Sequence, residues 1–194
     1  YIPSPLSSSL SSLTKDEKEL GTICIDLGHS TSSISVFDNN KFVYGDAIGV
    51  GSNNVTLDIA RGLSTTISSA ERLKTLYGSL VSSPSDDHEI IEIPIISGDK
   101  NTFKQITRSS LNAIIRPRIE ETLEMIWQKI KDNNLNNKKL NNVVLTGGGA
   151  MMDNIEKYVE TIFASGVRVS SPLEKLNLDN NFKKPNFCDI IGSI

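Results

Sequence analysis

The chain has 194 residues, of which 38% are hydrophobic and 22% are charged, as in a soluble globular protein of one domain or two small lobes. Twenty Lys and Arg against 23 Asp and Glu give a net charge of −3, so the basic footprint of a nucleic-acid-binding protein is missing. The apolar runs are far shorter than the roughly 20 residues that span a bilayer. We therefore expect no nucleic-acid partner and no membrane span.

Two cysteines, Cys24 and Cys188, lie far apart within hydrophobic stretches, without a CxxC pair or a partnering His cluster. This pattern favours two reduced core thiols over a disulfide or a metal pair, and so a reducing compartment. The chain begins with Tyr1 instead of Met and shows no signal-peptide pattern. We expect it to be a piece of a longer protein.

The first fifty residues predict a helix followed by a sheet. Leucines at helical spacing in a Ser-rich stretch favour a lead-in helix, within residues 1–18, over low complexity. Short runs with β-branched or aromatic residues and turn signals between them then predict an antiparallel meander. Its three strands would cover Thr22–Leu27, Ser32–Phe37 and Lys41–Val50.

Two helices and a strand are predicted next. Asn53 or Asn54 would cap the first helix, and Ser68, with Glu71 three residues on, has capping-box spacing for a second helix that Gly78 would end. Residues 89–97 read as a strand, at an edge or a bulge because they include a proline. A long helical pattern begins at residue 107, and the proline at position 117 should kink or divide it.

The clearest unit follows a polar connection over residues 133–142. Val143–Leu145 is a short buried strand, residues 146–150 form a glycine loop, Asp153 caps a helix, and Val167–Val169 is the next strand. Strands that first form a meander and later alternate with helices favour the α/β class, a mixed sheet with flanking helices.

Two loops carry residues suited to a nucleotide. Asp26, Gly28, Ser30 and Thr31 end a hydrophobic strand, where glycine lets amides converge on phosphate and a carboxylate can hold hydrated Mg²⁺. On these residues alone, an ordinary hairpin turn is favoured over a phosphate site. The second loop has three consecutive glycines before a helix, which lets a ligand lie on the backbone or simply makes the turn. It lacks the P-loop and dinucleotide fingerprints.

Taken in order, the motifs are similar to those of the second half of the FtsA-type cell-division proteins, in the actin-like ATPase superfamily. The resemblance covers nearly the whole chain. The glycine loops are common to the superfamily. Three further motifs, in this order and spacing, select the cell-division family: Asn54–Ala60 (NVTLDIA), Glu71-x-x-Lys74 and Pro117-Arg118.

The resemblance implies an actin-like second lobe, with subdomain IIA built from residues 19–49 and 107–194 and subdomain IIB inserted as residues 50–106. It implies bound ATP and Mg²⁺ in the whole protein, weakly or not at all in this chain alone, which should not hydrolyse ATP. By motif the nucleotide ligands would be Asp26, Gly28, Ser30, Thr31, Glu71, Lys74, Gly147, Gly148 and Gly149, with Asp26 on the metal through water.

Three positions depart from the family pattern. His29 and Ser30 stand where the family has glycines, and Ser33 stands where it has Asp. A side chain at position 29 puts close approach of phosphate in doubt and predicts weakened hydrolysis. We interpret His29 as a solvated loop residue instead of a catalytic one.

The resemblance also implies partners and a location. Arg118, with Arg108 and Lys104 earlier on the same helix, would form a basic face for the acidic carboxy-terminal tail of the tubulin-like protein FtsZ. The whole protein would form protofilaments and lie in the cytoplasm at the division septum, bound to the inner face of the membrane through a segment outside this chain. Two alternatives stay open: a lobe of a sugar or acetate kinase, and a pilus-assembly adaptor.

Overall fold

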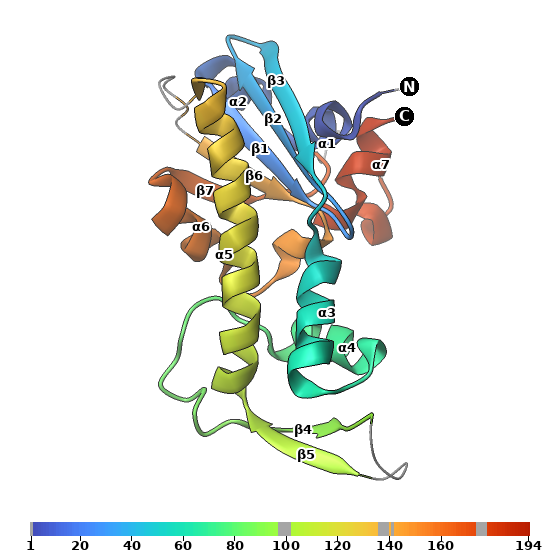
Figure 1. Ribbon diagram of the computed structural model, residues 1–194. Coiled ribbons are helices and arrows are strands. Elements are labelled where there is room, and N and C mark those ends of the chain that lie inside the picture. The colour runs from blue at the N-terminus through green and yellow to red at the C-terminus, as the bar shows by residue number, and fades with distance from the viewer. Residues whose placement is uncertain (1, 97–101, 136–139, 141, 174–177) are drawn as a thin grey trace.

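A computed structural model describes residues 2–96, 102–135, 140, 142–173 and 178–194. At its centre lies a mixed sheet of five strands: β1 (Thr22–Leu27), β2 (Ser32–Asp38), β3 (Lys41–Ile48), β6 (Asn142–Thr146) and β7 (Gly166–Val169). Their order is β3-β2-β1-β6-β7, with β1, β2 and β3 antiparallel and β6 parallel to both its neighbours (Figure 1). The predicted meander and the α/β class are confirmed.

Helices cover both faces of this sheet. Ile23 and Ile25 of β1 join the core that includes the buried side of α5 (Arg108–Asp132). Cys24, which points the other way, packs with Leu13 beside α1 (Ser4–Ser12). Because side chains alternate along a strand, Asp26 faces the α1 side as well. The short helix α7 (Cys188–Gly192) packs against α1 there, as Figure 1 shows.

A second part of the chain lies at the far end of α5. It comprises α3 (Ser52–Leu63), α4 (Ile67–Tyr77) and an antiparallel hairpin of β4 (Ile90–Pro94) and β5 (Phe103–Thr107). Figure 1 shows α5 running from this hairpin to the sheet. These elements correspond to the predicted inserted subdomain, although their buried residues belong to the same continuous core as the sheet. The division of the chain into two subdomains stays a prediction.

The helix α5 continues through Pro117, so the expected division is not found. The apolar positions on either side, among them Ile115 and Ile119, are buried in one core, which stabilises the continuous helix despite the missing hydrogen bond. The end of the strand predicted over 89–97 and half of the connection predicted over 133–142 lie outside the described residues.

Several helix starts differ from the predicted ones. The lead-in region holds two helices, because Thr14 forms a capping box with Glu17 and starts α2 (Lys15–Leu20). Gly51 and Thr66 precede α3 and α4 in place of the expected caps, and Asn154, in the left-handed conformation, precedes α6 (Ile155–Phe163).

Two further predictions concern the thiols and the membrane. Cys24 and Cys188 are both buried and free, as predicted for core thiols. Among the described residues, no helix has both the length and the apolar character needed to cross a bilayer.

Candidate functional site

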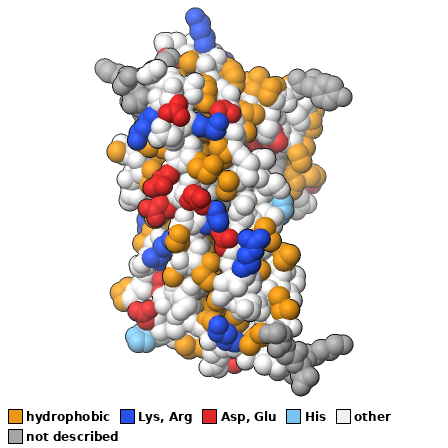
Figure 2. Space-filling view, in the orientation of Figure 1, with side chains coloured by type: hydrophobic (Ala, Val, Ile, Leu, Met, Phe, Trp, Pro, Cys, Tyr) orange, Lys and Arg blue, Asp and Glu red, His pale blue; other side chains and the backbone are white. Residues whose placement is uncertain are grey.

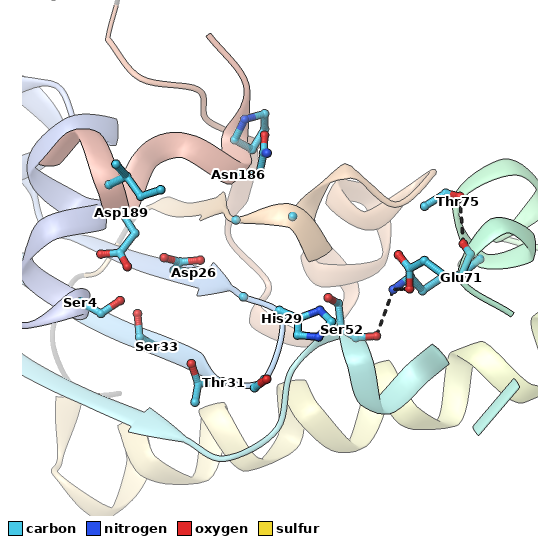
Figure 3. A pocket seen from close by; sticks show the side chains of 17 residues that line it. Ser4, Asp26, His29, Thr31, Ser33, Ser52, Glu71, Thr75, Asn186 and Asp189 are labelled. Carbon is cyan, nitrogen blue, oxygen red and sulfur yellow. Dashed lines mark hydrogen bonds and ion pairs between the residues drawn. The ribbon is translucent and has the colours of Figure 1, made fainter. Parts of the chain in front are cut away.

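A pocket of about 530 Å³ lies where the β1–β2 turn, α4 and the glycine turn after β6 meet (Figure 3). The residues predicted to hold a nucleotide come together here from three distant parts of the sequence. Eight of the nine line it: Asp26, Gly28, Ser30, Thr31, Glu71, Lys74, Gly147 and Gly148. The exception is Gly149, which is buried. A Cβ added to this residue would lie 2.8 Å from the Cβ of Leu27.

The turn between β1 and β2 offers backbone amides. Gly28 N–H donates to the Thr31 carbonyl at 3.0 Å, which closes a turn of His29 and Ser30. Neither of these residues has a positive φ, so the turn accepts side chains where the family has glycines. Within the described part of the chain, the amides of His29, Ser30 and Thr31 donate no hydrogen bond. Consecutive free amides in a turn of this kind suit an anion.

The helix α3 is attached to the same turn. The amides of Ser52 and Asn53 donate to the carbonyls of Gly28 and His29, at 2.9 and 2.8 Å. A Cβ on Gly51 would lie 2.5 Å from the His29 carbonyl oxygen, so only glycine permits this approach. The contact holds the turn and α3 in one arrangement. His29 itself also lines the pocket.

Asp26 is the buried acid of the site. Burial raises its pKa to about 6, and the negative charge of Asp189 adds to the rise, while the Ser8 hydroxyl opposes it. The carboxylate lies against the glycine turn: a Cβ on Gly147 would be 2.3 Å from Asp26 Oδ1. Gly147 also has φ of +86°, so glycine is required there both for conformation and for space.

At the other end of the pocket, Lys74 positions Glu71. The almost fully buried Lys74 donates to the Ser52 carbonyl (3.1 Å), Thr56 Oγ1 (2.8 Å) and Glu71 Oε2 (2.8 Å), which uses all three of its N–H groups. Thr56 Oγ1 donates to the same Glu71 oxygen at 2.5 Å. Among the described residues none donates to Glu71 Oε1, which leaves this oxygen of a half-exposed side chain for a ligand hydroxyl.

The Glu71 carboxyl is held in its charged form. Partial burial acts to raise its pKa, but the hydrogen bonds from Lys74 and Thr56 and the nearby positive charge outweigh burial and lower it. The pocket thus carries amide donors at one end and a fixed carboxylate acceptor at the other. This arrangement suits a ligand with phosphate groups and sugar hydroxyls.

Sequence reasoning missed the wall formed by η5 (Pro185–Phe187) and α7. The Pro185 carbonyl accepts from the Gly147 amide (3.1 Å) and from Thr146 Oγ1 (3.0 Å), so this segment is attached to the glycine turn. Asn186 and Asp189 extend from it into the pocket (Figure 3). No motif marks these residues, and only the folded chain brings them to the site.

The three predicted partner-binding cations do not share one helix face. Lys104 lies on β5, because residues 103–107 pair with β4 instead of entering the helix, and this part of the prediction is wrong. Arg108, at the start of α5, donates to the Tyr77 carbonyl (2.9 Å) and to Glu89 (3.1 Å).

Arg118 is held by two carboxylates. Its Nε donates to Asp58 at 2.5 Å and its Nη1 to Glu121. On the face shown in Figure 2, acidic and basic side chains are interspersed instead of gathered by sign.

A family model described as cell division protein FtsA matches residues 23–192. The chain belongs to the FtsA family. The cell division protein FtsA of Rhizobium meliloti (strain 1021) is 38% identical over 192 residues, which are 98% of this chain and 43% of that protein. This FtsA-family chain therefore spans less than half the length of that relative.

Solved structures share the fold. MreB5 of Spiroplasma citri bound to ADP matches with a TM-score of 0.74 at 18% identity, over 99% of this chain and 57% of that one. The PilM-PilN type IV pilus biogenesis complex matches with a TM-score of 0.66 at 16% identity, over 97% and 48%. The predicted actin-like fold is confirmed. The family match favours the FtsA resemblance over the kinase and pilus-assembly alternatives.

Proposed function

We propose that this chain supplies the adenine-nucleotide-binding half of an FtsA-type cell-division protein, with ATP or ADP in the pocket described above. The arrangement of the pocket carries the proposal: free amides of the β1–β2 turn for phosphate, the fixed Glu71 carboxylate for ribose hydroxyls, and Gly147 and Gly148 where a base can lie on the backbone. The volume of about 530 Å³ falls in the usual range for small-molecule sites. The ADP in the MreB5 structure supports the choice of ligand.

The donor set also fits Mg²⁺, which is a hard cation that prefers oxygen ligands and keeps several waters. Asp26 is a carboxylate beside the phosphate turn, and no described cation forms an ion pair with it. We propose that Asp26 holds Mg²⁺ through water. When bound, the metal would neutralise phosphate charge.

Saturation-transfer difference NMR of ADP tests the nucleotide site, because it detects weak binding. With EDTA present, we expect transfer to the adenine and ribose protons. Glu71→Gln keeps an acceptor for Lys74 but removes the charge that attracts ribose hydroxyls, so binding should weaken about tenfold. The matched control is Glu124→Gln, at an exposed position of α5. Absence of transfer to the wild-type chain, or equal binding by the Glu71 variant, would contradict the proposal.

We further propose that the partner is the carboxy-terminal tail of FtsZ and that Arg118 is its main contact. The side chain is partly exposed, and its Nη2 has no acceptor among the described residues, so a tail carboxylate can add to the existing pair. Arg108 is engaged by carboxylates around it, and Lys104 lies apart on β5. Neither is needed for this contact.

Fluorescence anisotropy with a labelled tail peptide tests the partner site. Arg118→Gln removes the cation without placing a third acid beside Asp58 and Glu121, and it should weaken binding about tenfold or more. Arg61→Gln, at an exposed position of α3, is the control. If the Arg118 variant binds as tightly as the control, the assignment is wrong.

For the whole protein, we propose self-association into protofilaments and tethering of FtsZ to the membrane at the division site. Family membership and the MreB-like fold support this role.

A further inference from the structure

Two carboxylates meet at one end of the pocket. Asp26 comes from the end of β1, and Asp189 comes from α7, 163 residues later in the chain. Figure 3 shows the two carboxylates directed toward one another, with the Ser33 hydroxyl on the same side. The register of the sheet explains this third group, because Ser33 of β2 is paired with Asp26 of β1.

The packing of α1 against α7 fixes the position of Asp189. The Ser7 hydroxyl donates to the backbone carbonyl of Asp189, and the Ser11 hydroxyl donates to that of Cys188 at 2.6 Å. A Cβ on Gly192 would overlap the Ser7 carbonyl, so the two helices lie in direct backbone contact. Because Ser7 bonds to the backbone of Asp189, the side chain is left free to face the pocket.

The negative charges of Asp26 and Asp189 have no described cation beside them, and the Ser33 hydroxyl has no described hydrogen-bond partner. Among the described residues, no Lys, Arg or His nitrogen lies within 4.0 Å of either carboxylate. Ser33 is 95% buried, and its Oγ finds no hydrogen-bond partner in the described part of the chain. An unpartnered buried hydroxyl beside two unpaired acids is costly unless a ligand completes it.

We propose that Asp26, Asp189 and Ser33 together bind a divalent cation of the Mg²⁺ class, which makes Asp189 a metal-binding residue. With Asp26 acting through a bound water, the Asp189 carboxylate and the Ser33 hydroxyl leave the remaining positions of an octahedral ion to water or to phosphate oxygens. The site lies in the proposed nucleotide pocket and deepens that proposal, but the cation can be tested with no nucleotide present.

Mn²⁺ alone is the probe, with free Mn²⁺ counted by electron paramagnetic resonance and the bound position mapped from amide line broadening. We expect one Mn²⁺ per chain, broadening centred on Ser33, and affinity lowered about tenfold or more by Asp189→Asn. That change keeps the backbone contact to Ser7. The control is Asp87→Asn, in an exposed turn. Excess Mg²⁺ should displace Mn²⁺ and raise the melting temperature of the wild-type chain but not of the Asp189 variant.

The possible results distinguish the cation site from the nucleotide site. Equal Mn²⁺ affinity in the wild-type and Asp189→Asn chains, broadening centred elsewhere, or no binding by the wild-type chain would overturn the cation site. Because Mn²⁺ is added without nucleotide, and ADP is tested with EDTA, failure of one proposal leaves the other standing.

Discussion

Replacing Asp26 by Asn should make this protein more stable at neutral pH. Burial and the nearby Asp189 raise the pKa of the Asp26 carboxyl from 3.8 to about 6. The shift of roughly 2 pH units corresponds to about 3 kcal/mol of free energy of unfolding. Asn has nearly the same shape, can accept from Ser8 and can donate to Asp189, and carries no charge to desolvate.

The sign of the pH dependence follows from the direction of the shift. Between about pH 4 and pH 6, the folded state holds a proton on Asp26 that the unfolded state has released, so the stability of the wild-type protein falls as pH rises. Above the folded-state pKa the loss is complete. The stability difference between the Asn variant and the wild type should therefore be near zero at pH 4 and reach about 2 to 3 kcal/mol at pH 7.5.

Urea denaturation of both proteins at several pH values between 4 and 7.5 measures this difference. Asp87→Asn, at an exposed position, controls for removing one acid and should be nearly neutral. A variant of Asp26 that is less stable than the wild type at pH 7.5, or a difference independent of pH, would refute the reasoning. An acid kept against stability is typical of a functional site.

Two further changes test the packing around the pocket. Lys74→Met leaves the Glu71 carboxylate without its buried donor, so we expect the free energy of unfolding measured with urea to fall by about 1 to 3 kcal/mol. Arg72→Met, at an exposed position of the same helix, should change stability little. Equal stability of the two variants would exclude the positioning role of Lys74. Burial raises the pKa of the Cys24 thiol to about 12 and also raises that of Cys188. Both thiols should resist Ellman's reagent until urea unfolds the chain, and rapid labelling of the folded protein would contradict their burial.

Local turn chemistry made part of this site predictable. The sequence predicted a strand that ends near Asp26 and Gly28, and a glycine turn between a strand and a helix. The structure contains both. The carboxylate proposed to bind ribose, that of Glu71, could also be predicted, because Glu71 and Lys74 lie one helical turn apart.

The remaining features depend on tertiary packing. Asp189 reaches Asp26 only because α7 packs against α1, and no spacing in the sequence records that contact. The strand β5 was missed because Ile106 is its one buried residue, which leaves no alternation to detect. The polar contacts of Arg108 come from Tyr77, from the turn of Asp86 and Glu89, and from Asp153. Because these three segments are distant in sequence, sequence analysis left this cation free.

Amide chemical-shift mapping with ADP is the most direct test of the nucleotide site. In a ¹⁵N-labelled sample of this chain, millimolar ADP should shift the amides of His29, Ser30, Gly147 and Gly148 together, since these residues line one pocket. Amides on the β4–β5 hairpin should stay in place. Shifts confined to the hairpin, or no shifts at all, would contradict the central claim that the turn and the glycine loop form one nucleotide site.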